Sequence, residues 1–249
     1  ATGLAQADTL ALRPRPMHVH FGAIWEAIAD ATPDAPAVIQ GARRVSWRDY
    51  EQRAARLAQA LLDAGLGAHA KVGMYLYNSP EYCETNFAAI KIRGIPINVN
   101  YRYLDDELAY LLDNADMEAL VFHSSLGDRV ARVRARLPRL RLLIEVADGP
   151  AGDGSTHVEG AVPYETIQST LAPAERIEPR GDEIYMFYTG GTTGMPKGVM
   201  YSLRDFAGFF LRTYPAMIGQ SRRFDPAALP ALARELRARG EATVSMSGP

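Results

Sequence analysis

The chain has 249 residues, of which 47% are hydrophobic, enough to bury a sizeable core in one large domain or two small ones. Its 27 basic and 29 acidic residues leave a net charge of -2, so no bulk attraction to nucleic acid is expected. No apolar run approaches the roughly 18 to 20 residues that cross a bilayer, and the start lacks a secretory signal, which predicts a soluble, cytoplasmic protein without a transmembrane segment. The single cysteine, Cys83, excludes an internal disulfide and is expected to face the core.

The first predicted elements form an entry block. Apolar residues at helical spacing predict a helix over 21–31, which the prolines at 33 and 36 end. A short hairpin is expected from strands 37–40 and 43–46. Ser46 and Asp49 then form a capping box for a helix that runs to Leu62.

A regular alternation of strands and helices follows. Strands are predicted at 72–77, 95–99, 119–122 and 140–146, and helices at 79–92, 105–113 and 127–137. Such alternation requires a parallel sheet, because each helical crossover must return the chain to the same edge. The fold class is therefore layered α/β, with a mostly parallel sheet and flanking helices.

A Gly-, Asp- and Ser-rich segment at 147–160 is expected to be a surface loop that links two α/β subdomains, 1–146 and 161–249. The second begins with a short helix at 164–171. The apolar strand Ile184 to Tyr188 then leads directly into a glycine-rich stretch, and a second capping box, Ser202 with Asp205, starts a helix. Aromatic residues on that helix are expected to face the core: Phe206, Phe209, Phe210 and Tyr214.

The stretch from Tyr188 to Gly198 reads YTGGTTGMPKG and has the composition of a polyphosphate site. Glycines let the backbone N–H groups come close to an anion, and three threonines add hydroxyl donors. Lys197 supplies a compact positive charge behind the stiff Pro196. The residues expected to contact phosphate are Thr189, Gly190, Gly191, Thr192, Thr193, Gly194 and Lys197.

Three other interpretations of this stretch were compared. A P-loop needs a Gly-Lys-Ser/Thr ending that opens a helix, whereas Lys197 follows proline, precedes glycine and is followed by a strand pattern. The glycine spacing also differs from the dinucleotide fingerprint. The residues alone do not exclude the third interpretation, a plain hairpin turn that binds no ligand. A phosphate grip in a strand–loop–strand unit is favoured, without help from a helix dipole.

The motif closely resembles the Y-T-S-G-T-T-G-x-P-K-G-V signature of the adenylate-forming superfamily, with Gly190 where that family usually has serine. Upstream blocks also resemble the N-terminal domain of that family: 72–82, 90–102 and 107–112. The resemblance covers about residues 20 to 205. It implies the N-terminal portion of the adenylate-forming fold, here incomplete.

The resemblance implies an acyl-CoA synthetase, an ATP-dependent acid-thiol ligase of fatty-acid and lipid metabolism. A carboxylic acid attacks Mg-ATP to give an acyl-adenylate and pyrophosphate, and CoA then displaces AMP. ATP, Mg²⁺ and CoA are the expected cofactors and substrates, the acid is a fatty acid or a sterol side chain, and a homodimer is left open. Two alternatives are an enzyme that passes the acyl group to a carrier protein and a non-catalytic nucleotide-binding fragment.

The remaining catalytic parts of that family find no match in this chain. The magnesium-binding glutamate, the ribose-binding aspartate and the C-terminal domain with its lysine are expected beyond residue 249, so the chain is expected to be an inactive N-terminal fragment. No metal site is predicted within it. A run of arginines from Arg129 to Arg141 is expected to be a solvated helix face and not a nucleic-acid site.

Overall fold

A computed structural model describes residues 19–149, 158–191 and 194–217, with the single positions 231, 234 and 238. Elements of the first half, in chain order, are α1 (Phe21–Ala31), β1 (Pro36–Gln40), β2 (Arg43–Ser46), α2 (Trp47–Asp63), β3 (Lys71–Tyr75), α3 (Pro80–Lys91), β4 (Ile95–Asn98) and α4 (Asp105–Asn114). The second half contains β5 (Ala119–His123), the 3₁₀ turn η1 (Ser124–Leu126), α5 (Gly127–Arg134), β6 (Leu142–Val146), β7 (Val162–Pro163), α6 (Tyr164–Thr170), β8 (Ile184–Gly191), β9 (Gly194–Ser202) and α7 (Leu203–Met217).

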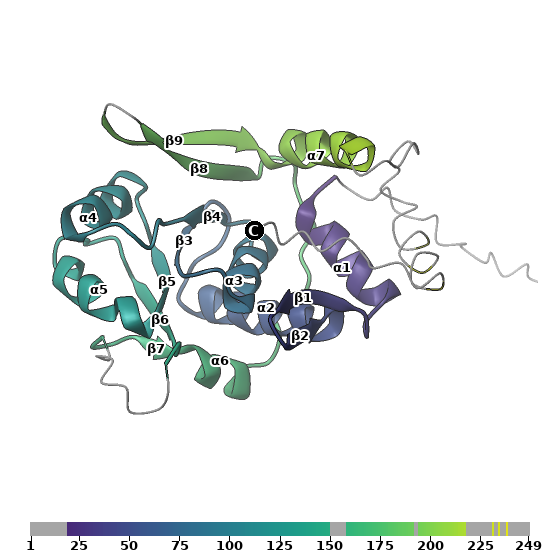
Figure 1. The fold of residues 1–249 in the computed structure, drawn as a ribbon, viewed down its shortest axis with the longest axis horizontal. Coiled ribbons are helices and arrows are strands. Elements are labelled where there is room, and N and C mark those ends of the chain that lie inside the picture. The colour runs from purple at the N-terminus through teal and green to yellow at the C-terminus, as the bar shows by residue number, and fades with distance from the viewer. Residues whose placement is uncertain are drawn as a thin grey trace, which may run out of the picture.

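Seven strands form one mixed sheet in the order β7-β6-β5-β3-β4-β8-β9. Every neighbouring pair is parallel except β8 with β9, which are antiparallel. The run β4-β3-β5-β6-β7 has the doubly wound order of flavodoxin-like folds, in which successive strands are added on opposite sides of β3. The predicted α/β class with a mostly parallel sheet is confirmed (Figure 1).

Local signals in the sequence explain where the helices begin. Ser46 accepts the N–H of Asp49 at 3.0 Å and caps α2, as predicted. Ser79 caps α3, whose first residue is Pro80, where a missing N–H costs nothing. Strand β3 ends two residues earlier than predicted, because the Tyr77 N–H donates to His123 Nδ1 at 3.0 Å instead of extending the ladder.

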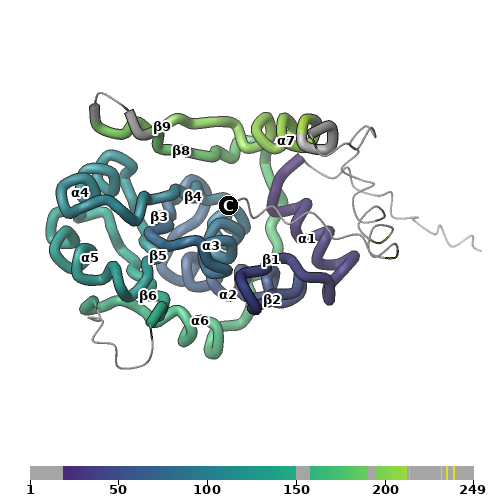
Figure 2. Tube along the Cα trace, viewed as in Figure 1, coloured from purple at the N-terminus to yellow at the C-terminus, as the bar shows by residue number. Residues whose placement is uncertain are grey.

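The core lies on both faces of the sheet. All five residues of β5 are buried, as expected for a central parallel strand covered on each side. Leu120 and Phe122 point into a cluster formed with residues of α4 and α5, whereas Val121 points into a cluster with residues of α2, α3 and α6. Figure 2 shows the helices wrapped around the sheet, with the β8–β9 hairpin and α7 along one side.

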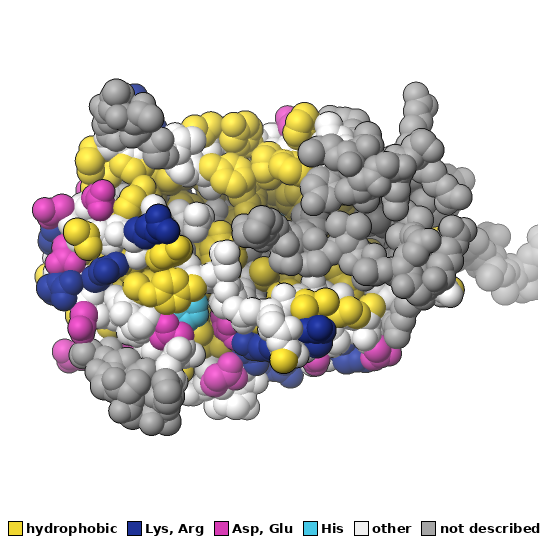
Figure 3. Space-filling model, in the orientation of Figure 1, with side chains coloured by type: hydrophobic (Ala, Val, Ile, Leu, Met, Phe, Trp, Pro, Cys, Tyr) yellow, Lys and Arg dark blue, Asp and Glu magenta, His cyan; other side chains and the backbone are white. Residues whose placement is uncertain are grey.

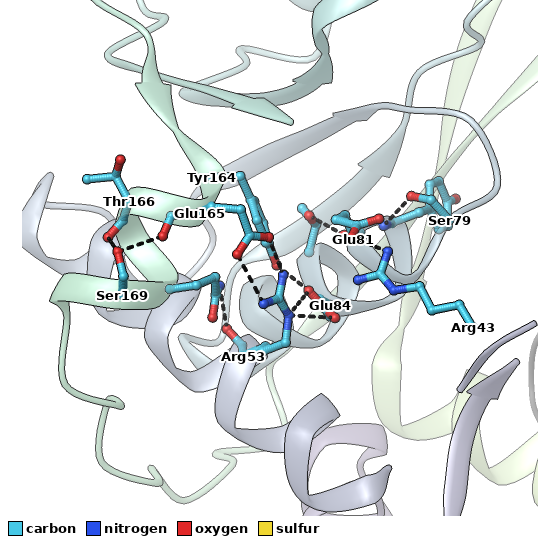
Figure 4. Close-up of polar contacts among 12 residues, drawn as sticks. Arg43, Arg53, Ser79, Glu81, Glu84, Tyr164, Glu165, Thr166 and Ser169 are labelled. Atoms are coloured by element: carbon cyan, nitrogen blue, oxygen red, sulfur yellow. Dashed lines mark hydrogen bonds and ion pairs between the residues drawn. The ribbon is translucent and has the colours of Figure 1, made fainter. Parts of the chain in front are cut away.

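An ion cluster around the buried Glu84 joins three of these helices. Arg53 of α2 donates to both carboxylate oxygens of Glu84 on α3 at 3.0 Å, and to Glu165 of α6 at 2.7 Å (Figure 4). The Tyr164 hydroxyl also donates to Glu84, whose side chain is fully buried. Burial raises the pKa of Glu84, although Arg53 and Tyr164 oppose that shift. Pairing therefore satisfies a carboxylate that would be costly to bury alone.

Segments on both sides of the expected 147–160 linker contribute strands to this one sheet, since β7 pairs with β6 and β8 pairs with β4. Residues 150–157 of the linker lie outside the described part, and the division into two subdomains, 1–146 and 161–249, stays a prediction. None of the helices in the described ranges has the length and apolarity that crossing a bilayer would need.

Candidate phosphate-binding site

The glycine- and threonine-rich motif forms the tip of the β8–β9 hairpin. Thr189 pairs with Lys197, and Gly191 pairs with Gly194, which leaves only Thr192 and Thr193 between the strands. The predicted strand–loop–strand unit is therefore confirmed, and the strands reach further into the motif than expected. Thr192 and Thr193 themselves lie outside the described residues, so their predicted phosphate contacts stay predictions.

Thr189 and Lys197 lie opposite each other, and both are exposed. The Thr189 hydroxyl donates to the Lys197 carbonyl at 3.4 Å, which joins the two strands just below the tip. Among the described carboxylates, none forms an ion pair with Lys197. The ammonium of Lys197, which has no ion-pair partner among the described residues, thus lies at one end of the hairpin, where it can contact an anion.

The hairpin is irregular at the glycines. A register shift lies between Thr189 and Gly191, where the single residue Gly190 of β8 stands opposite two residues of β9, Met195 and Pro196. Such bulges bend a strand and release backbone groups from pairing, and they often lie beside functional sites. Together with the two-residue tip, this shift is where the backbone N–H groups of the predicted glycines could turn toward phosphate.

Gly198 has a different role from the one a phosphate loop suggests. A Cβ placed on Gly198 would lie 3.2 Å from Cζ of the Tyr188 ring and 3.3 Å from Sδ of Met186. The glycine therefore lets the Tyr188 ring lie across β9. Burial raises the pKa of Tyr188, so its hydroxyl stays protonated and donates to Asn114 Oδ1 at 2.9 Å.

The usual ligand position of a doubly wound sheet is filled by side chains in this chain. Ligands of such sheets bind outside the carboxyl ends of the two strands between which the strand order reverses, here β3 and β5. Tyr77 and His123 stack at that point, with ring centroids 5.2 Å apart. Burial lowers the pKa of His123, against the charges of Asp148 and Glu81, so the ring stays neutral and accepts the Tyr77 N–H.

A cavity of about 750 Å³ lies between α1, β1, α3, β8 and α7. Nine of the twenty described residues that line it are aromatic, and hydrophobic side chains gather over β8, β9 and α7 in Figure 3. Phe206 and Phe210 line this cavity as α7 residues, but Phe209 is 56% exposed, so the prediction that it faces the core is wrong. The side chain of Tyr214 is outside the described set.

Two polar atoms at the cavity wall, Trp47 Nε1 and Asn86 Oδ1, are buried without a hydrogen-bond partner in the described part of the chain. Buried polar groups are normally paired. Both atoms are therefore open to a partner outside the described residues.

The arginines at 132–141 are exposed to solvent, as predicted. They also form surface ion pairs with carboxylates of α4 and of the segment between α4 and β5, namely Arg132 with Asp105, Arg136 with Asp106, Arg139 with Asp116 and Arg141 with Glu118. Arg129 donates to the Tyr75 hydroxyl and the Tyr101 carbonyl. Their charges are therefore partly neutralised within the protein.

Sequence reasoning missed the contacts that α4 makes with the hairpin. Tyr110 donates to the Pro196 carbonyl at 3.4 Å, and Asn114 accepts from Tyr188. Tyr110 and Asn114 stand four residues apart on α4 and therefore on one face, but Asn114 lies one residue beyond the helix predicted at 105–113. No local signal indicated that this face meets a hairpin more than 70 residues further along the chain.

The doubly wound fold and the glycine-, threonine- and lysine-bearing hairpin define an α/β protein with a candidate polyphosphate site. A family model described as AMP-binding enzyme matches residues 25–227. The chain belongs to this family of AMP-binding enzymes.

Curated relatives are acyl-CoA ligases. The chain is 40% identical over 197 residues to the medium-chain acyl-CoA ligase Mig of Mycobacterium avium, a match covering 74% of this chain and 35% of that protein. It is also 40% identical over 190 residues to a 3-oxocholest-4-en-26-oate–CoA ligase of Rhodococcus rhodochrous, covering 76% and 34%. The chain thus spans about a third of the length of these relatives.

Solved structures agree on the fold. The anthranilate CoA ligase AuaEII, in complex with anthranoyl-AMP, aligns with a TM-score of 0.68 at 22% identity, covering 77% of this chain and 36% of that one. ATP-bound MatB from Rhodopseudomonas palustris aligns with a TM-score of 0.65 at 24% identity, covering 79% and 37%.

Proposed function

We propose that the protein carrying this chain is an ATP-dependent acyl-CoA ligase, and that the β8–β9 hairpin binds the β- and γ-phosphates of ATP. The observation that carries the proposal is the pairing of exposed Thr189 with exposed Lys197 at the tip of a glycine-rich hairpin, inside a chain that belongs to the AMP-binding family. The names of the relatives support CoA as the acceptor.

The proposed reaction begins when a carboxylate attacks the α-phosphorus of ATP. The bond from that phosphorus to the bridging oxygen breaks, and pyrophosphate leaves with its negative charge. Lys197 would stabilise that charge, and Thr189 with the glycine N–H groups would fix the position of the leaving group. Positioning and fixed charges of this kind provide most of what phosphoryl chemistry requires from a protein.

Magnesium is expected with the nucleotide. The described residues contain no group of three or more His, Cys, Asp or Glu side chains that could hold a metal ion. The described residues thus do not form a complete Mg²⁺ site made of protein ligands alone. Magnesium is usually bound through substrate phosphates and one or two carboxylates. No step is assigned to a metal bound by this chain.

The proposed acid is a medium- or long-chain fatty acid or a sterol side-chain acid, because the relatives act on acids of those kinds by name. The site of the reaction would be the cytoplasm, where ATP and CoA are available. Since the chain spans about a third of its relatives, we further propose that it does not turn over alone.

The test uses the complete protein with ATP, CoA and a panel of fatty and sterol acids. We expect acid-dependent release of AMP and pyrophosphate and formation of an acyl-CoA. Release of ADP, or no reaction with any acid, would contradict the proposal. Acyl transfer to a carrier protein, with CoA inert, would favour the other adenylate-forming interpretation. Acid-dependent ATP–pyrophosphate exchange by the 249-residue chain would refute the inactivity of the fragment.

A further inference from the structure

Two residues of α4 contact the loop end of the β8–β9 hairpin. Tyr110 and Asn114 stand four residues apart, so they project from one face of the helix. The Tyr110 hydroxyl donates to the Pro196 carbonyl at 3.4 Å, and Asn114 Oδ1 accepts from the Tyr188 hydroxyl at 2.9 Å. Figure 1 shows α4 beneath the loop end of the hairpin. One helix face is thus bonded to both strands.

These contacts lie directly beside the candidate phosphate ligands. Tyr188 precedes Thr189 in β8, and Pro196 precedes Lys197 in β9. Because successive side chains of a strand point to opposite faces, the face of Tyr188 is opposite to that of Thr189. The contacts with α4 therefore hold one face of the hairpin and leave the other face free for a ligand.

A third contact makes the arrangement stiffer. The Tyr188 ring lies across Gly198, where any Cβ would come within 3.2 Å of it. Ring and hydroxyl are therefore fixed at two points, by β9 below the ring and by Asn114 at its end. Tyr188 also packs against the main core cluster beneath α4. A shift of the hairpin tip relative to α4 would have to break these contacts together.

We propose that Tyr110 and Asn114 are positioning residues that set where Thr189 and Lys197 meet the nucleotide phosphates. This inference rests on the proposed function of the hairpin. The residues do not touch the phosphates; they act through Pro196 and Tyr188. A catalytic site whose ligands are misplaced by about 1 Å loses a large part of its effect, so bonds that add little to stability can still control binding.

The experiment measures MgATP affinity of the complete protein by isothermal titration calorimetry. Tyr110→Phe and Asn114→Ala should each weaken binding by roughly 3-fold to 10-fold, the effect of one lost hydrogen bond. Tyr188→Phe should match Asn114→Ala, because both remove the same bond. The KM for the carboxylic acid should stay unchanged, whereas general damage to the fold would alter it as well.

The decisive comparison is a double-mutant cycle with Lys197→Ala. If Tyr110 acts by placing Lys197, Tyr110→Phe should have less than about a 1.5-fold effect on ATP affinity once Lys197 is already removed. Equal effects in both backgrounds would show that Tyr110 acts independently of Lys197 and would overturn the proposal. So would an unchanged affinity in Tyr110→Phe when Lys197→Ala alone weakens binding.

A matched control is Tyr50→Phe. The Tyr50 hydroxyl on α2 also donates to a backbone carbonyl, that of Cys83 in α3 at 3.1 Å, and not to a residue of the hairpin. This variant should bind ATP like the unmodified protein. If Lys197→Ala itself leaves ATP affinity unchanged, the hairpin is not the phosphate site, and Tyr110 and Asn114 then have no phosphate ligands to position. If Lys197→Ala weakens ATP binding but Tyr110→Phe does not, only the positioning role is contradicted.

Discussion

Arg93 donates to Glu183 at 2.7 Å and ties the turn after α3 to the residue that precedes β8. Glu183 also accepts the backbone N–H groups of Arg180 and Gly181, each at 2.7 Å, and is 3% exposed. Its own carbonyl accepts the N–H of Leu203 at the start of α7. One carboxylate residue thus fixes where the β8–β9 hairpin enters and leaves the body of the protein.

Glu183 should make stability depend on pH. Burial alone would raise its pKa, but Arg93 and the backbone N–H groups lower the pKa to about 2. A carboxyl group with a lowered folded-state pKa contributes stability above its unfolded pKa of 4.5 and loses it as pH falls toward 2. At pH 7 that contribution is on the order of 3 kcal/mol.

The measurement is urea unfolding of the unmodified protein and of Glu183→Gln between pH 7 and pH 3. The glutamine variant should be less stable at pH 7, and the difference should shrink as the pH falls. A difference in unfolding free energy that stays constant over this range would contradict the role assigned to the charge of Glu183.

Gly198→Ala should disturb the hairpin through Tyr188. The added methyl group would press against the Tyr188 ring. The hydrogen bond from the Tyr188 hydroxyl to Asn114 limits how far the ring can move away. Gly67 is a matched control, because a Cβ there meets no heavy atom within 4 Å. By chemical denaturation, Gly198→Ala should be less stable than Gly67→Ala by about 1 to 2 kcal/mol. Equal stability of the two variants would show that the Tyr188 ring moves aside without cost, and would contradict this prediction.

Arg53→Met should be strongly destabilising, because it leaves the carboxylate of Glu84 buried without its cation. We expect a loss of about 3 to 5 kcal/mol in unfolding free energy. Arg48 on the same helix is the control, since its pair with Asp34 is exposed and Arg48→Met should cost less than about 1 kcal/mol. Adding Glu84→Gln to Arg53→Met should recover part of the loss, and no recovery would argue against an unpaired charge as the cause.

Cys83 should react slowly with thiol reagents. Burial, with smaller contributions from Glu84 and Glu81, raises the pKa of the thiol to about 11. At pH 8 the thiolate fraction is then on the order of 100-fold below that of an ordinary cysteine. Iodoacetamide should label the folded protein at least about 100-fold more slowly than it labels an ordinary exposed cysteine. In denaturant the two labelling rates should be equal. Rapid labelling of the folded form would contradict the raised pKa of the Cys83 thiol.

Local signals predicted most elements of this fold. Capping by Ser46, Ser79 and Ser202 and the alternation of apolar strands with amphipathic helices were enough to define the elements and the parallel sheet. The strand pattern after Lys197 also predicted the hairpin correctly. These features depend on neighbours within a few residues, so a single sequence contains them.

Long-range pairings could not be predicted in the same way. The bonds from Arg53 to Glu84 and Glu165 span 31 and 112 residues, and that from Tyr110 to Pro196 spans 86. Each partner alone reads as an ordinary surface residue of a helix or a strand. Only the packing of helices against one another and against the hairpin brings such groups together, and packing is a property of the whole chain.

The central claim is that the β8–β9 hairpin binds the β- and γ-phosphates of ATP, and its most direct test compares two ligands in the complete protein. Lys197→Ala should weaken ATP binding by at least about tenfold and change AMP binding by less than about twofold, because AMP lacks those phosphates. Lys71→Ala, at the opposite end of the parallel strands, should change neither affinity. Unchanged ATP affinity in Lys197→Ala, or an equal loss for ATP and AMP, would contradict the assignment.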